Sequence, residues 1–147
     1  MTRRFLRRAA ILALVLASGC IENRLTTPSG QLQTAWSKWA LTHPASYQMT
    51  YQKLCFCGET RAVIIVFRNG AIESAKYLDT GATAPTAGLP SVDDVFNIIN
   101  DAVSRNAATI NASYDATLGY PVSVFIDYFA NAADDELTIT ISNFTPL

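Results

Sequence analysis

Hydrophobic residues recur along this chain with two periods, one typical of helices and one typical of strands. In residues 31–43, QLQTAWSKWALTH, the apolar positions are three or four residues apart, which places them on one face of a helix. Pro44 limits the extension of this helix. We interpret the apolar face as core rather than as an anchor for a partner; it consists of Leu32, Ala35, Trp36, Trp39 and Ala40.

Three strands are predicted between this helix and a loop at residues 79–90. Residues 46–57, SYQMTYQKLCFC, alternate between apolar and polar, which indicates a half-buried strand. Residues 61–78, RAVIIVFRNGAIESAKYL, read as two strands joined at Asn69-Gly70, a strong hairpin signal. In the second of these strands the apolar phase slips, which predicts a bulge at Glu73-Ser74.

The second half of the chain repeats this order of elements. In residues 91–107, SVDDVFNIINDAVSRNA, Ser91 is a predicted N-cap and Asp94 follows three positions later, close to the capping-box pattern. The apolar face of this helix contains Val92, Val95, Phe96, Ile99, Ala102 and Val103.

Three further strands are predicted from the alternating segments TINASYD, YPVSVFIDY and ELTITISNF, at residues 109–115, 120–128 and 136–144. In the middle segment the expected inward side chains are Tyr120, Val122, Val124, Ile126 and Tyr128.

The element order α-βββ-α-βββ predicts an α+β fold. We expect an antiparallel sheet of about six strands with both helices on one face, because each helix has a single apolar stripe. Val95, Phe96 and Ile99 should be buried against this sheet. Their expected partners include Ile65, Val124 and Ile139. The Thr-, Ala-, Gly- and Pro-rich loop at residues 79–90 does not divide the chain, since neither half alone makes a convincing core. Residues 31–147 are therefore predicted to form one domain.

The first 20 residues, MTRRFLRRAAILALVLASGC, predict export. Four arginines precede an apolar stretch that is too short to span a bilayer, which takes about 20 residues, so residues 1–19 read as a signal peptide. The segment LASGC resembles the bacterial lipobox, in which the cysteine becomes the acylated N-terminus. This resemblance implies lipidation at Cys20; ordinary cleavage at the same bond is the alternative. Residues 20–30 would then be the lipidated N-terminus and a short tether.

The expected location is the cell envelope, with the membrane as a partner through the N-terminal lipid. Ile21 follows the cysteine where inner-membrane lipoproteins commonly carry Asp, which implies the periplasmic face of the outer membrane in a Gram-negative organism. Without residues 1–19 the chain keeps seven basic and twelve acidic residues, a net charge of −5. An acidic balance with no basic cluster argues against nucleic acid as a partner.

Residues 47–144 resemble an uncharacterised family of bacterial lipoproteins known as domain of unknown function 6174. The resemblance is carried by YQMTYQKLCFC with its Cys-Phe-Cys motif, AVIIVFRNGAIESAKY, VDDVFNII, YDATLGYPVSVFID and ADDE. It implies secretion, anchoring and a single domain, and it implies no activity.

Cys55 and Cys57 are the two remaining cysteines if Cys20 carries lipid. In an oxidising compartment we predict a disulfide between them. Extended residues i and i+2 place their Cα atoms roughly 6.6 Å apart, so the strand must bend for the bond to form. The three-residue ring would stabilise the fold by only about 1.6 kcal/mol. The alternatives are two reduced buried thiols, a catalytic redox pair and a zinc site, for which His43 is the sole histidine.

No motif for a catalytic nucleophile or a phosphate loop is present, so we expect a non-enzymatic protein without cofactor, metal or catalytic residues. It would be a binding or structural module for an envelope protein or the cell wall. A thiol–disulfide redox protein using Cys55 and Cys57 is the alternative. A weaker alternative is a calcium-dependent module around Asp127, Asp134, Asp135 and Glu136, although such residues are also common in solvated turns.

Overall fold

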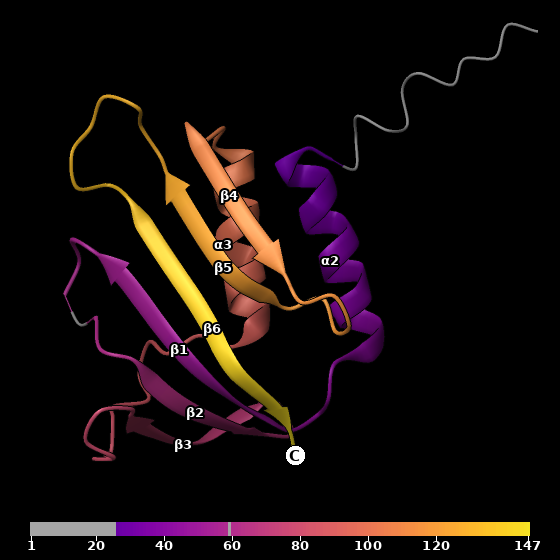
Figure 1. Ribbon diagram of the computed structural model, residues 1–147, viewed down its shortest axis with the longest axis vertical. Coiled ribbons are helices and arrows are strands. Elements are labelled where there is room, and N and C mark those ends of the chain that lie inside the picture. Colours follow the sequence, from indigo (N-terminus) through magenta and orange to yellow (C-terminus); the bar gives the residue numbers. More distant parts are fainter. Residues whose placement is uncertain (1–25, 59) are drawn as a thin grey trace, which may run out of the picture.

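The six strands form one antiparallel sheet in the order β3-β2-β1-β6-β5-β4, and two helices pack on it (Figure 1). The computed structural model describes residues 26–58 and 60–147. The predicted signal peptide and Cys20 lie outside the described residues. The elements are α2 (Pro28–Thr42), β1 (Tyr47–Cys55), β2 (Val63–Arg68), β3 (Ala71–Tyr77), α3 (Val92–Ser104), β4 (Thr109–Tyr114), β5 (Pro121–Asp127) and β6 (Leu137–Pro146). The predicted α+β fold and its element order are confirmed.

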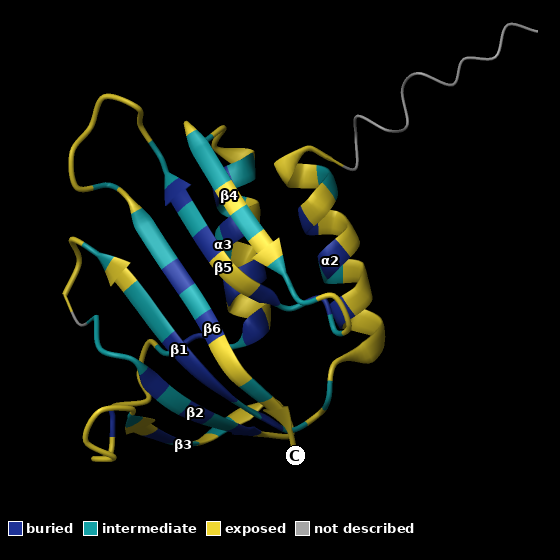
Figure 2. Cartoon of the chain, viewed as in Figure 1, coloured by how far each residue is buried: buried dark blue, intermediate teal, exposed yellow. Residues whose placement is uncertain are grey.

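Both helices cover the same face of the sheet. The Tyr47 hydroxyl on β1 accepts a hydrogen bond from the backbone N–H of Val92, at the start of α3. The Tyr47 ring also meets the indole of Trp39, on α2, at a centroid distance of 5.9 Å. In Figure 2 the buried residues run along the middle of the strands and along the helix surfaces turned toward them. None of the described helices is both long enough and apolar enough to cross a membrane.

Helix α2 begins three residues before the predicted start. Thr27 is its N-cap, with a side-chain oxygen that accepts from the backbone N–H of Gly30 at 3.2 Å, and Pro28 occupies the first turn. Any tether therefore ends before Pro28 rather than at Gly30. The buried face is also narrower than predicted, because Trp36 is half-buried and Ala40 is exposed.

Helix α3 has the predicted capping box and the predicted buried face. Ser91 Oγ accepts from the backbone N–H of Asp94 at 3.1 Å, and the Asp94 carboxylate accepts from the backbone N–H of Ser91 at 2.8 Å. Val95, Phe96 and Ile99 are fully buried. The expected sheet partners Ile65, Val124 and Ile139 are buried as well.

Two bulges set which residues of the sheet face the helices. Between β2 and β3 the register shifts after Val66, which leaves Glu73 as the extra residue, as predicted. Between β4 and β5, Ser113 pairs with Ser123 and Tyr114 with Pro121, so Val122 is extra. The prediction that Val122 points inward was wrong: its side chain is exposed and Pro121 is buried instead.

Candidate functional site

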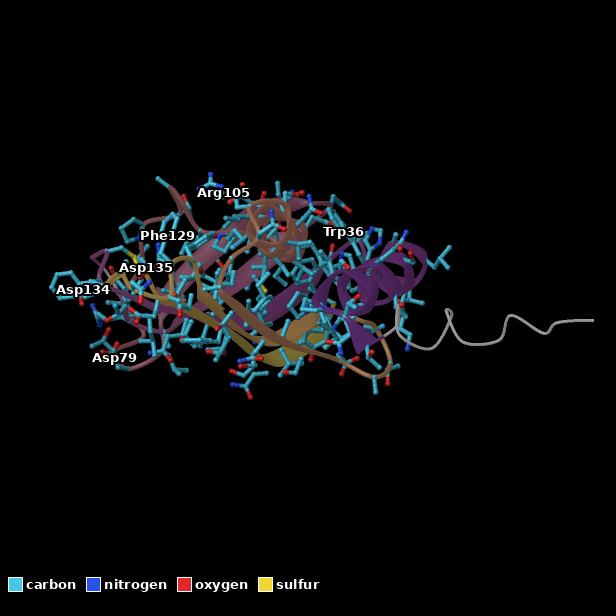
Figure 3. The ribbon with its side chains drawn as sticks, turned by 90° about the horizontal axis from the view of Figure 1, so that it is seen from above. Trp36, Asp79, Arg105, Phe129, Asp134 and Asp135 are labelled. Atoms are coloured by element: carbon cyan, nitrogen blue, oxygen red, sulfur yellow. A yellow bond between two sulfur atoms is a disulfide. The ribbon has the colours of Figure 1, made fainter. Side chains whose placement is uncertain are left out.

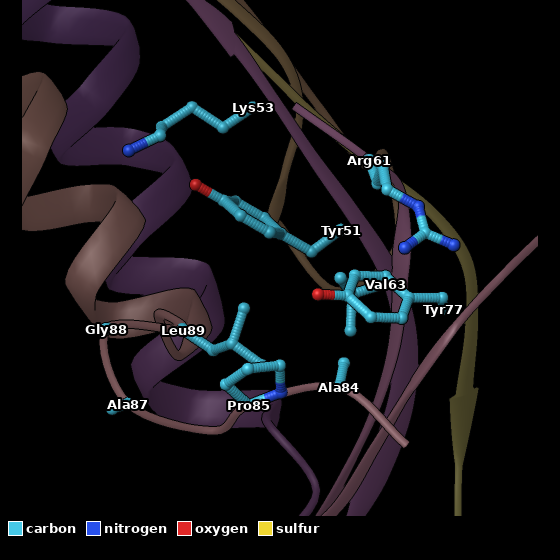
Figure 4. A pocket seen from close by; sticks show the side chains of 10 residues that line it. All are labelled: Tyr51, Lys53, Arg61, Val63, Tyr77, Ala84, Pro85, Ala87, Gly88 and Leu89. Atoms are coloured by element: carbon cyan, nitrogen blue, oxygen red, sulfur yellow. The ribbon is translucent and has the colours of Figure 1, made fainter. Parts of the chain in front are cut away.

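A cavity of about 380 Å³ opens where the end of β1, the start of β2 and the loop before α3 meet (Figure 4). The loop is held against the edge strand, since the backbone N–H of Ala84 donates to the carbonyl oxygen of Ala75 on β3 at 2.9 Å. Residues 84–89 thus form one wall and the inward side chains of the sheet form the other. The larger side chains of the lining are Tyr51, Lys53, Arg61, Val63, Tyr77 and Leu89.

Tyr51 and Lys53 point into this cavity because they are two residues apart on β1 and share its inward side. Figure 4 shows the two side chains extending in the same direction. Tyr51 is only 6% exposed, and its hydroxyl has no hydrogen-bond partner among the described residues. Burial raises the pKa of Tyr51 to about 12, so the hydroxyl stays protonated and can donate.

Lys53 is a half-buried lysine on the strand side that is otherwise occupied by core residues. Within residues 26–58 and 60–147, its ammonium group has no ion pair and no hydrogen bond. A lysine can lay its aliphatic stem along an apolar wall while its ammonium group meets solvent or a ligand. The cavity therefore presents a cation and a hydroxyl donor, neither of which has a partner in the described structure.

Arg61, by contrast, is engaged at the rim of the cavity. Its guanidinium group donates to both carboxylate oxygens of Asp79, at 2.6 and 3.2 Å, and lies 3.7 Å from the centroid of the Tyr77 ring. The hydrogen bonds from Arg61 lower the pKa of Asp79, so this carboxylate stays charged and offsets the arginine. The pair joins the segment after β3 to the segment before β2, and Lys53 is left as a cation of the lining that pairs with none of the described carboxylates.

The disulfide predicted between Cys55 and Cys57 is present next to this cavity, two residues beyond Lys53. Strand β1 ends at Cys55, and the chain bends over residues 56–58, which brings the two Cα atoms to 5.1 Å. Gly58 follows with a φ of +112°, a conformation that favours glycine. Phe56, between the cysteines, is 82% exposed, so the ring projects from the end of the sheet.

The acidic residues considered for calcium lie at the end of β5 and in the loop between β5 and β6. Asp135 accepts a hydrogen bond from the backbone N–H of Phe129 at 2.8 Å and so closes the β5–β6 loop. Figure 3 shows Phe129, Asp134 and Asp135 at the end of the molecule away from Trp36. In the part of the chain that the structure describes, no three His, Cys, Asp or Glu side chains are grouped so that they could hold a metal ion. Asp135 is half-buried, and its second carboxylate oxygen, Oδ1, is buried without a hydrogen-bond partner among the described residues.

Sequence reasoning found the disulfide and missed the cavity. Lys53 carried the relevant signal, because it interrupts the apolar side of a predicted strand that includes Tyr51. The second wall could not be placed, since residues 84–89 approach β1 only through the fold of the loop.

Residues 31–146 match the sequence model described as Family of unknown function (DUF6174). The chain belongs to this family. The match covers all eight elements except the first three residues of α2, and the resemblance seen in the sequence is confirmed at the level of the family. Searches of curated proteins and of solved structures found no match.

Proposed function

We propose that this protein is a lipid-anchored cell-envelope binding module whose binding site is the cavity between β1 and residues 84–89. The observation that carries the proposal is the cavity itself, whose lining includes the Tyr51 and Lys53 side chains without a partner among the described residues. A ligand with a hydrogen-bond acceptor could take the proton of the Tyr51 hydroxyl, and such a bond contributes about 0.5–1.5 kcal/mol net. A role in binding rather than catalysis is supported by the lack of a nucleophile motif in the sequence.

Binding in the cavity is tested by narrowing its mouth. Ala87 lines the cavity and is exposed, whereas Ala82 is exposed on the same loop and is not part of the lining. Fluorescence of an apolar dye, 1-anilinonaphthalene, should rise on addition of the wild-type protein. We expect Ala87→Trp to weaken dye binding about tenfold, and Ala82→Trp to leave it unchanged. Equal binding by both variants would place the dye elsewhere and contradict the proposed site.

The anchoring part of the proposal is supported by the N-terminal sequence and is tested at Cys20. Cys20→Ser should abolish incorporation of a labelled fatty acid and yield uncleaved precursor or soluble protein. The matched control is the double change Cys55→Ser, Cys57→Ser, which should keep the label because these cysteines are distant from the lipobox. Acylation that persists in Cys20→Ser would show that the lipid is attached elsewhere or that the lipobox assignment is wrong.

A redox role for Cys55 and Cys57 is the second candidate, and the solvent exposure of Cys57 supports it. Exposed disulfides tend to be the labile ones, and structural disulfides have potentials below about −300 mV. Thiol titration in buffers of defined redox potential separates the two roles. A potential above this value would support redox function, whereas a lower one would assign the bond to structure.

A further inference from the structure

We infer that the cavity takes a small amphiphilic anion, a monocarboxylate whose head group is held by Lys53 and Tyr51 and whose apolar body lies against Val63 and Leu89. The inference rests on the proposed function, because it names the ligand class of the same site. The inference requires the cavity to bind an anion more tightly than a neutral analogue, whereas the proposed function does not.

The charge of the head group follows from the electrostatics of the lining. The Arg61 charge is already offset by Asp79, with a closest N–O distance of 2.6 Å. Lys53 supplies a second positive charge, and none of the described carboxylates pairs with it. An anion bound in the cavity beside Lys53 would be attracted by its ammonium group, and this attraction is stronger near the protein surface than in bulk water.

The hydrogen-bonding groups favour an anion that can accept from two donors at once. The Tyr51 hydroxyl and the Lys53 ammonium belong to neighbouring inward positions of one strand, and Figure 4 shows them on the same side of it. A carboxylate offers two acceptor oxygens, so one oxygen can take the hydroxyl proton while the other meets the ammonium group. Hydrogen bonds to a charged acceptor are also stronger than those between neutral groups.

The remaining walls of the cavity indicate the polarity and size of the ligand's body. Val63 and Ala84 are buried, with 4% and 3% exposure, and Leu89 and Tyr77 are partly buried. The volume of about 380 Å³ lies at the lower end of the range of about 300–1,000 Å³ for small-molecule sites. This size suits one short apolar chain or ring, and a whole phospholipid or a folded partner would not fit.

The test is calorimetric titration of the purified domain with decanoate, decanol and acetate, each below its aggregation limit. Decanoate should bind about tenfold or more tightly than decanol, which lacks the charge, and acetate, which lacks the body, should bind weakest. Decanoate affinity should also fall as salt is added, because the head group is held by charge.

Four variants assign the effect to residues. Lys53→Met keeps the aliphatic stem and should lose about tenfold in decanoate affinity, whereas Lys53→Arg should retain most of it. Tyr51→Phe removes the hydroxyl and should also weaken decanoate binding. Lys76→Met is the matched control, since Lys76 is exposed on the outward side of β3. This variant should bind decanoate like wild type. Circular dichroism confirms that each variant is folded.

Two results would overturn the inference and separate it from the proposed function. Equal affinity for decanoate and decanol, with no salt dependence in wild type, would reject an anionic ligand even if Lys53→Met failed to fold. If Ala87→Trp still weakened dye binding in that case, the cavity would keep its role as a binding site. Decanoate binding unaffected by Ala87→Trp would instead overturn both.

Discussion

Gly119 shows how one residue position sets the contact between a loop and a helix. It ends the β4–β5 turn with a φ of +85°, and a Cβ atom built there would lie 2.5 Å from the carbonyl oxygen of Ala35 on α2. Asp115 stabilises the same turn by accepting from the backbone N–H groups of Thr117 and Leu118, at 2.9 and 2.6 Å. The turn therefore rests directly on the helix backbone, which cannot move aside as a flexible side chain would.

Gly119→Ala should consequently destabilise the fold by more than backbone strain alone. Gly81 is the matched control, because it also has a positive φ, +68°, but open space around it. We expect Gly81→Ala to lower the free energy of unfolding by about 1 kcal/mol through backbone strain, and Gly119→Ala to lower it by at least about 2 kcal/mol. Urea unfolding measures both changes. Equal losses would show that α2 and the turn are not in close contact.

Phe96 is the aromatic centre of the contact between the helices and the second half of the sheet. Its ring stacks on Trp36 of α2 at a centroid distance of 5.3 Å and on Tyr114 of β4 at 6.2 Å. Phe96→Ala should lower the free energy of unfolding by about 3–5 kcal/mol. Phe129→Ala, at a side chain that is 68% exposed, should change it by at most about 0.5 kcal/mol. A small loss at Phe96 would mean that α3 packs with another face.

At the scale of elements, the disulfide affects only the end of β1. The bond links residues two positions apart, and the sheet on both sides of β1 is held by its own hydrogen-bonded pairs. The double change Cys55→Ser, Cys57→Ser should leave a folded domain that is less stable by at most about 2 kcal/mol. Mass spectrometry of a non-reduced digest should show the bond in the wild-type protein. Failure of the double variant to fold would overturn this local role.

The elements that sequence patterns predicted well are those whose signals are local. The capping box at Ser91 and Asp94 and the bulge at Glu73 each depend on residues a few positions apart. The bulge at Val122 depends on how β5 aligns with β4. The alternation within β5 alone therefore led to a wrong prediction of the face on which Val122 lies. The early start of α2 was different, because Thr27 and Pro28 are a recognisable cap and first turn that the prediction passed over.

The distinction between local and long-range signals also explains which parts of the candidate site could be predicted. The disulfide could be predicted from two nearby cysteines and from the expectation of export to an oxidising compartment. Lys53 was visible as a cation among apolar inward positions, but its neighbours Val63 and Leu89 lie farther along the chain. Their approach depends on how the loop after β3 crosses back toward the sheet, and no periodicity encodes that path.

At the scale of the molecule, the centre of the sheet joins the two halves of the chain. Strand β1, from the first half, pairs along nearly its whole length with β6, the last strand. Each half repeats one helix and three strands, but in isolation β1 or β6 would be an unpaired edge with an exposed row of backbone donors and acceptors. We therefore expect the two halves to fold as one cooperative unit, with no domain boundary in the loop at residues 79–90.

The separated halves should therefore fail to fold. A folded chain that is then cut in the loop should stay folded. We expect fragments 26–86 and 87–147, expressed singly, to show little cooperative unfolding, because each loses the β1–β6 pairing and half of the core. A protease site inserted after Thr86, an exposed loop position, provides the control: the cleaved but undissociated protein should keep the circular dichroism of the intact chain. Cooperative unfolding of either fragment alone would contradict the single-domain architecture. Recovery of the native spectrum on mixing the two fragments would show that the pairing of β1 with β6 suffices to bring the halves together.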